Sequence, residues 1–208
     1  MRFLVTCSFL TFTAASTPAV SIGDAIIQAT TNGKVDSFLG IQYATVGERF
    51  SRSTLIEPTD NGISWGPNCH QVYTGLPTFL HEARNESEEC LYLNIWRPAE
   101  VEENLPVMVW IHGGGFAVGS GADSIHPGTH LAANHNVLVV TFNHRLGVLG
   151  FLPQDERGTG GMNGVYDQIV ALRWIRKHIS AFGGDPDRVT IFGESSGAES
   201  ACMLGVSP

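Results

Sequence analysis

Hydrophobic and polar positions alternate in some stretches of this 208-residue chain and form continuous apolar runs in others. Residues 25–30 and 35–43 are β-favouring runs that flank an Asn-Gly pair, which favours a tight hairpin between antiparallel strands. Residues 91–96 alternate between apolar and polar positions. The later runs are continuous: residues 107–111, 137–142 and 189–192. Continuous runs are typical of strands buried on both faces of a parallel sheet.

A long amphipathic segment, residues 166–179, lies between the last two apolar runs and predicts a helix. Its apolar face consists of Ile169, Leu172, Ile175 and Ile179, and its outer face carries Arg173, Arg176 and Lys177. Gly183 and Gly184 end this helix, and the chain then turns into the strand at 189–192. Such a strand, helix and strand unit can form a parallel crossover. Residues 44–80 lack periodicity and predict irregular surface structure.

The overall composition narrows the class of protein. With 43% hydrophobic and 15% charged residues, the chain resembles a globular protein made of one domain or part of one. Its formal net charge is −8 and its basic residues are scattered singly, which argues against nucleic acid or an anionic membrane surface as a partner. Composition and charge do not argue against a small neutral substrate.

The first nineteen residues predict a secretory signal peptide. One early positive charge, a moderately apolar stretch and small residues lead to a cleavage site between Ser16 and Val20. A buried first strand or an anchor helix is the alternative, although the apolar stretch is too short to span a bilayer. We therefore expect a secreted protein whose mature domain begins at residue 20.

Removal of the signal leaves three cysteines, Cys69, Cys90 and Cys202, so that one of them stays free or pairs elsewhere. Cys69 and Cys90 flank a polar segment that looks like a surface loop, and closing a loop of that size contributes about 3 kcal/mol. Cys202 has apolar neighbours and is interpreted as a small buried hydrophobic residue. The polar segment also contains Asn85, in a sequon for N-glycosylation.

Ser195 is the candidate nucleophile, because it stands in a Gly-x-Ser-x-Gly motif directly after the strand at 189–192. A serine between a strand and a helix takes a strained backbone angle, and Gly193 and Gly197 remove side chains that would collide with neighbouring elements. The hydroxyl then projects at the N-terminus of a helix that begins at Ser196, where the dipole favours negative charge. Because the motif alone is common by chance, the assignment depends on its position between a predicted strand and a predicted helix.

A second motif, His112 to Phe116, follows the strand at 107–111 and contains three consecutive glycines. Glycines leave backbone N–H groups free to approach a substrate oxygen, as an oxyanion hole requires. The alternatives are a flexible glycine loop and a phosphate cradle, and the latter lacks the Lys-Ser/Thr ending of a P-loop.

The combination of these motifs resembles the type-B carboxylesterase and lipase family, the α/β-hydrolases that include cholinesterases and secreted fungal lipases. The similar stretches are residues 38–44, 89–96, 110–116, 143–147, 183–186 and 192–197. The resemblance implies an α/β-hydrolase fold, with a mostly parallel central sheet and an antiparallel N-terminal part. It also implies hydrolysis of small-molecule or lipid esters without a metal or cofactor.

Carried over by position, the resemblance assigns roles to individual residues. Ser195 is then the nucleophile, and the N–H groups of Gly114, Gly115 and Ser196 form the oxyanion hole. Cys69 and Cys90 correspond to the family's first disulfide. Glu194 corresponds to an acid close to the catalytic histidine, and the alternative for it is a local charge at the helix entry.

The sequence departs from the family pattern at three positions. Gln42 stands where proline is frequent, His144 where tyrosine is frequent, and Ser196 where alanine is usual. Only Ser196 belongs to the predicted site, and its backbone donor is unaffected by the side chain.

The family's triad acid and histidine lie downstream of the nucleophile, whereas all eight histidines here precede Ser195. Without a base a serine is a weak nucleophile. The chain is therefore interpreted as the N-terminal portion of a secreted esterase, whose sheet would expose an apolar edge if it ended at Pro208. A truncated inactive product and a cholinesterase-like adhesion module are the alternatives. The oligomeric state is not indicated.

Overall fold

A computed structural model describes residues 17–60, 62–72, 85–100, 103–123, 128–153 and 161–206, so most of the predicted signal peptide lies outside the described residues. The strands are β1 (Ala19–Ile22), β2 (Ala25–Gln28), β3 (Thr30–Thr31), β4 (Val35–Gln42), β5 (Ala44–Thr45), β6 (Thr54–Leu55), β7 (Asn68–Cys69), β8 (Glu86–Ser87), β9 (Tyr92–Pro98), β10 (Leu105–Ile111), β11 (Leu138–Phe142) and β12 (Gly184–Gly193). The helices are α1 (Thr129–His135), α2 (Gly147–Phe151), α3 (Asn163–His178), the 3-10 helix η2 (Ile179–Phe182) and α4 (Ser196–Gly205).

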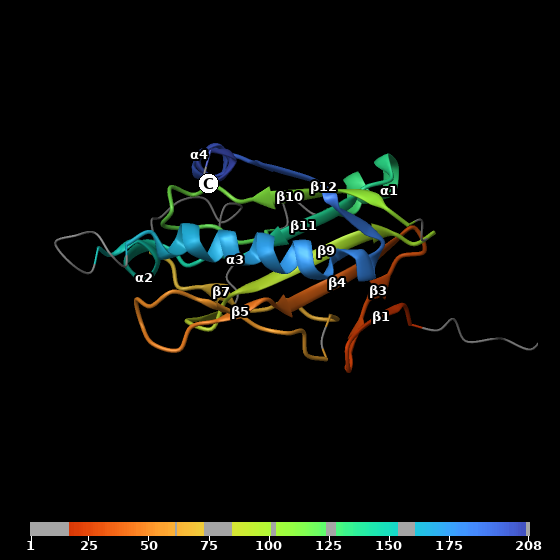
Figure 1. The fold of residues 1–208 in the computed structure, drawn as a ribbon, viewed down its shortest axis with the longest axis horizontal. Coiled ribbons are helices and arrows are strands. Elements are labelled where there is room, and N and C mark those ends of the chain that lie inside the picture. The colour runs from red at the N-terminus through yellow and green to blue at the C-terminus, as the bar shows by residue number, and fades with distance from the viewer. Residues whose placement is uncertain are drawn as a thin grey trace, which may run out of the picture.

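A six-stranded sheet in the order β12-β10-β11-β9-β4-β3 forms the centre of the molecule (Figure 1). The strands from β3 to β11 pair antiparallel, whereas β10 pairs parallel with both β11 and β12. The crossover predicted between the last two apolar runs is present, because β11 leads through α3 to β12 on the far side of β10. The expected α/β-hydrolase fold is confirmed with its antiparallel N-terminal part, although among the described strands the sheet is mixed rather than mostly parallel, with two parallel and three antiparallel pairings.

The predicted hairpin is present in a modified form. The side chain of Asn32 accepts hydrogen bonds from the N–H groups of Lys34 and Val35, at 2.9 and 2.8 Å, and this turn joins β3 to β4. The run at 25–30 is divided, however, because β2 pairs with β1 in a separate two-stranded sheet. In the stretch 44–80, predicted as irregular, the described residues form the short strands β5, β6 and β7, and residues 61 and 73–80 lie outside the described residues.

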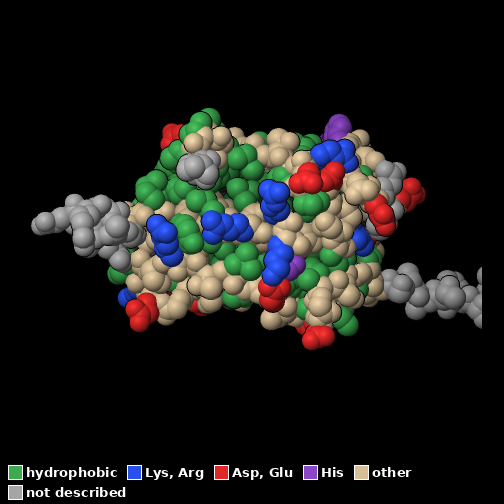
Figure 2. All heavy atoms as spheres, in the orientation of Figure 1, with side chains coloured by type: hydrophobic (Ala, Val, Ile, Leu, Met, Phe, Trp, Pro, Cys, Tyr) green, Lys and Arg blue, Asp and Glu red, His purple; other side chains and the backbone are tan. Residues whose placement is uncertain are grey.

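Helices cover both faces of the sheet. All five residues of β11 are buried, as its continuous apolar sequence predicted. Leu138 and Val140 join the main core with Trp174 and Ile175 of α3, whereas Val139, on the opposite face, packs in a second cluster with residues of α1. The predicted basic face of α3 is exposed, and Figure 2 shows Lys and Arg side chains along the face where α3 lies. Among the described residues, none of the helices is long and apolar enough to cross a membrane.

Two predictions about burial were wrong. The runs at 107–111 and 189–192 are not fully buried on both faces: Met108, Trp110 and Phe192 are only half-buried and Thr190 is exposed, although β10 has a strand on each side and β12, among the described residues, only one. Cys202 is exposed rather than buried. The buried side of α4 is formed by Ser196, Gly197 and Ser200. Cys202 lies away from that side, although its neighbours in sequence are apolar.

Candidate active site

Ser195 occupies a sharp turn between β12 and α4 and is exposed. Its φ is 53° and its ψ is −124°, a combination that a residue with a side chain adopts only under strain. The turn is closed by hydrogen bonds from the Gly197 N–H to the Glu194 carbonyl (2.8 Å) and from the Glu199 N–H to the Ser195 carbonyl (3.0 Å). The elbow predicted from the sequence is therefore present.

The two glycines of the motif are required by close packing. A Cβ on Gly193 would collide with the Gly197 backbone and with the Ile111 carbonyl, and a Cβ on Gly197 would collide with the carbonyls of Ile111 and His112. The elbow thus packs directly on the end of β10. Because Ile111 and Gly193 are partners in the parallel pairing of β10 and β12, the loop after β10 and the elbow after β12 leave the sheet side by side.

The glycine loop after β10 is a tight turn of left-handed residues. Gly114, Gly115 and Phe116 have φ values of 108°, 62° and 57°. The N–H groups of Ala117 and Val118 both donate to the Gly114 carbonyl, at 3.1 Å. The N–H of Phe116 donates to the Ser196 hydroxyl oxygen at 3.4 Å, which links the loop to the elbow. The structure therefore brings together the segments that contain Gly114, Gly115, Ser195 and Ser196.

Glu194 lies against the loop from the elbow side. A Cβ on Gly113 would collide with the Glu194 carboxylate, so the side chain of Glu194 passes directly over that glycine. Glu194 itself is exposed. Its carboxylate thus lies between the glycine loop and the elbow. The sequence predicted an acid near the site but not this contact with the loop.

His112 supports the loop and does not pair with Ser195. Its ring stacks on that of His144 with centroids 4.6 Å apart and planes within 1° of parallel, and its Nδ1 lies 2.9 Å from the Gly113 carbonyl oxygen. Burial, with a further contribution from His144, lowers the pKa of His112 to about 3, and burial lowers the pKa of His144 to about 4. Both rings are therefore neutral at neutral pH. Within the described residues, the Ser195 hydroxyl makes no hydrogen bond with a histidine.

Sequence reasoning assigned no role to Asn143, which organises the base of the site. Its Oδ1 accepts hydrogen bonds from the Gly121 N–H (2.8 Å) and the Ser120 hydroxyl (3.1 Å), and its Nδ2 donates to the Pro67 carbonyl (2.9 Å). These bonds fasten the segment that follows the glycine loop to the end of β11. The available signal was the motif at residues 143–147, in which Asn143 is the first residue.

Arg145 and Asp167 form a buried ion pair. Arg145 donates to Asp167 from Nε and Nη2, both at 2.8 Å, and also from its backbone N–H at 3.1 Å. Asp167 is fully buried and belongs to α3. The pair thus joins the segment between β11 and α2 to the long helix. Neither residue was among the predicted site residues.

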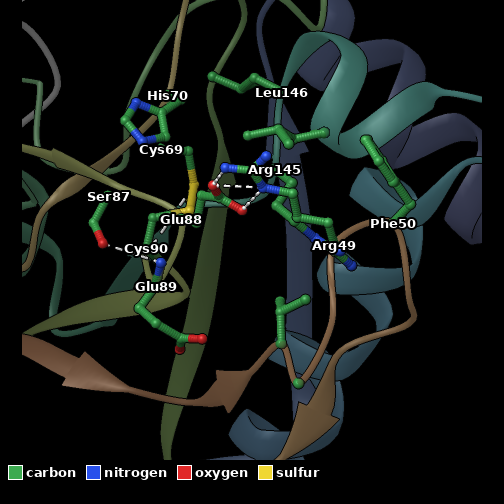
Figure 3. A pocket seen from close by; sticks show the side chains of 13 residues that line it. Arg49, Phe50, Cys69, His70, Ser87, Glu88, Glu89, Cys90, Arg145 and Leu146 are labelled. Atoms are coloured by element: carbon green, nitrogen blue, oxygen red, sulfur yellow. Dashed lines mark hydrogen bonds and ion pairs between the residues drawn. A yellow bond between two sulfur atoms is a disulfide. The ribbon is translucent and has the colours of Figure 1, made fainter.

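A cavity of about 190 Å³ lies beside the disulfide (Figure 3), and its lining includes no residue of the elbow or the glycine loop. The predicted Cys69–Cys90 disulfide is present and lines it. Arg49 and Glu88 on its wall pair with each other, with Arg49 Nε 2.8 and 2.9 Å from the two carboxylate oxygens. Asn85, which lies five residues before Cys90 in the polar segment, is exposed. Among the described residues, no cluster of three or more His, Cys, Asp and Glu side chains could hold a metal ion.

The mixed sheet, the strained serine between a strand and a helix, and the adjoining glycine loop define an α/β-hydrolase. The chain belongs to the carboxylesterase family, since the model of that family, described as "Carboxylesterase family", matches residues 22–208.

Individual relatives agree with this assignment. The chain is 40% identical over 190 residues to para-nitrobenzyl esterase of Bacillus subtilis and 42% identical over 185 residues to bile salt-activated lipase of Mus musculus. These alignments cover 88% and 84% of this chain but only 39% and 30% of the relatives. A solved structure of PNB esterase superposes with a TM-score of 0.81 at 39% identity, covering 91% of this chain and 41% of that one. The chain thus spans well under half the length of these relatives.

Proposed function

We propose that the protein containing this chain hydrolyses carboxylic esters through an acyl-enzyme on Ser195. The observation that carries this proposal is the conformation of Ser195, an exposed serine with a φ of 53° at the first turn of α4. Backbone strain of this kind is retained where it positions a reacting group. An exposed hydroxyl at a helix N-terminus is accessible to a substrate carbonyl, and the dipole of α4 favours the negative charge that develops.

In the proposed reaction the Ser195 oxygen attacks the ester carbonyl, and the carbonyl oxygen becomes an oxyanion. The N–H groups of Gly114, Gly115 and Ser196 are the proposed donors to that oxyanion. Their segments adjoin because β10 and β12 are paired and because Phe116 and Ser196 are in contact. Collapse of the intermediate expels the alcohol, and water then hydrolyses the acyl-enzyme.

The Ser195 proton requires a general base. We propose that this base is a histidine outside the present sequence, as the family pattern implies, because the chain covers 30–39% of the relatives' length. Glu194 is proposed to lie beside that histidine, and its position over Gly113 at the edge of the site supports this role. A carboxylate there would stabilise the imidazolium that forms during attack.

The proposed substrates are small-molecule or lipid esters. The names of the relatives refer to a para-nitrobenzyl esterase and a bile salt-activated lipase, which cover both kinds of ester. We also propose that the protein is secreted, that residues 1–19 are its signal peptide and that residues 20–208 belong to one catalytic domain. The disulfide and the exposed Asn85 support export, since disulfides persist in oxidising compartments.

A fluorophosphonate probe tests the central claim, because such probes phosphonylate only activated serines. The native secreted protein is treated with the probe, digested, and mapped by mass spectrometry, in parallel with its Ser195→Ala variant. We expect labelling at Ser195 in the native protein, no labelling in the variant, and hydrolysis of p-nitrophenyl esters that labelling abolishes. A native protein that neither reacts nor hydrolyses these esters would instead be an inactive product.

A further inference from the structure

We propose that the Ser196 side chain is a positioning group that holds the oxyanion loop, residues 112–116, against the nucleophile elbow. This inference rests on the proposed function, in which the backbone N–H of Ser196 is one of three oxyanion donors. The side chain adds a second role to the same residue. An alanine at this position could not make the contact described below.

The contact itself joins the two halves of the proposed oxyanion hole. The Phe116 N–H donates to the Ser196 hydroxyl oxygen over 3.4 Å, and Ser196 is only 4% exposed. A methyl group at this position would fill similar space but would offer no acceptor. The Phe116 N–H would then lose its hydrogen-bond partner at a partly buried position, which is unfavourable.

The link acts on Gly115 through the peptide bond. The Phe116 N–H and the Gly115 carbonyl belong to one planar peptide group, so restraining that N–H restrains the orientation of the whole group. Gly115 has a φ of 62°, and no atom lies within 4 Å of where its Cβ would be, so little packing restrains it directly. A glycine in open space has many accessible conformations. The hydroxyl of Ser196 thus supplies a restraint that local packing does not.

Phe116 is held from its other side as well. Its carbonyl accepts a hydrogen bond from the Gly147 N–H at 2.7 Å, and its ring lies 5.0 Å from that of Phe151. These contacts anchor Phe116 to α2 in spite of its left-handed φ of 57°. Phe116 is therefore a bridge: α2 holds its carbonyl and ring, and Ser196 of α4 holds its N–H. Donors fixed before reaction stabilise a developing oxyanion without reorganisation.

The chain offers a matched control on the same helix. Ser200 is also buried, and its hydroxyl accepts a hydrogen bond from Gln168 Nε2 at 3.0 Å. Ser200→Ala therefore removes a buried serine hydroxyl from α4 without touching the oxyanion loop. Comparing the two variants therefore separates a loss of α4 stability from the loss of the contact between Ser196 and the loop.

The experiment measures, in the full secreted protein, the rate constant for phosphonylation of Ser195 by a fluorophosphonate. We expect Ser196→Ala to react about 3- to 10-fold more slowly than the native protein, the size expected for one neutral hydrogen bond, and Ser200→Ala to react at nearly the native rate. In ester hydrolysis, Ser196→Ala should lower kcat and leave KM nearly unchanged. Hydrogen exchange of the Phe116 amide should accelerate in Ser196→Ala and not in Ser200→Ala.

Equal rates and equal exchange in the native protein and Ser196→Ala would overturn the inference. Equal slowing in both variants would overturn it too, because the effect would then come from α4 as a whole. A native protein that fails to react would overturn the proposed function and this inference with it. Faster exchange at Phe116 with an unchanged rate constant would show a structural contact only, and would contradict the positioning role.

Discussion

The centre of the sheet and its outer end, at β12 and α4, differ in how their residues are held. At the centre, every residue of β11 is buried, Arg145 and Asp167 pair with each other, and Asn143 binds the backbone of Gly121 and Pro67. At the outer end, Ser195 is exposed and strained, and Phe116 has a left-handed backbone. The comparison shows that the elbow combines exposure with a strained backbone, whereas the buried amide and ion pair at the centre are held by hydrogen bonds.

Replacement of Ser195 is expected to have the largest effect and to separate activity from stability. Ser195→Ala and Ser195→Gly should both lower ester hydrolysis by on the order of 10⁴-fold or more, since the nucleophile is lost. In urea titration, the free energy of unfolding of Ser195→Gly should be about 1 kcal/mol higher than that of Ser195→Ala, because glycine relieves the strain at a φ of 53°. Equal stability of the two variants would show that the elbow is unstrained.

Asp167→Ala should destabilise the protein by about 3–5 kcal/mol, since it leaves the buried Arg145 guanidinium without its partner. Urea unfolding measures this change. Glu88→Ala is the matched control, because it breaks the exposed pair with Arg49, which solvent screens, and should alter stability only slightly. If the two variants were equally stable, the buried ion pair would not hold the centre as we infer.

Loss of the disulfide should rank next. Cys69→Ser with Cys90→Ser opens a loop whose ends are 21 residues apart and should cost about 3 kcal/mol in urea unfolding. The phosphonylation rate of the folded double variant should stay close to the native rate, because the disulfide borders the cavity, whose lining includes no residue of the elbow. A marked fall in that rate would mean that the cavity and the candidate site are coupled.

The stacked histidines predict a smaller, pH-dependent effect. The pKa values of His112 and His144 in the folded state lie below those of unfolded histidine, so the unfolded state binds more protons and stability falls as pH drops below about 6.5. Between about pH 7 and about pH 5, each ring should account for about 2 kcal/mol of this loss. His144→Tyr, which restores the residue frequent in the family, removes one titrating ring and should reduce the loss by about that amount in urea unfolding. An unchanged pH dependence would contradict the assignment.

Local features of the chain followed from its sequence. The glycines around Ser195 and the position of α4, which begins at Ser196 as predicted, depend on backbone conformations that only particular residues adopt. The strands around residues 107–111 and 137–142 followed from apolar runs, and the disulfide between Cys69 and Cys90 followed from the family resemblance. Such features depend on residues close in sequence or on a recognised motif, and so can be predicted without knowing what packs against them.

Burial and long-range contacts were decided only by the tertiary structure. The runs at 107–111 and 189–192 are continuous like the buried strand at 137–142, yet each has residues that are only half-buried. Cys202 is exposed because it lies away from the buried side of α4. The stack of His112 on His144 and the bond from Phe116 to Ser196 join residues 32 and 80 positions apart. Sequence periodicity determines which element a segment forms, whereas exposure and side-chain partners depend on which other elements the fold places beside it.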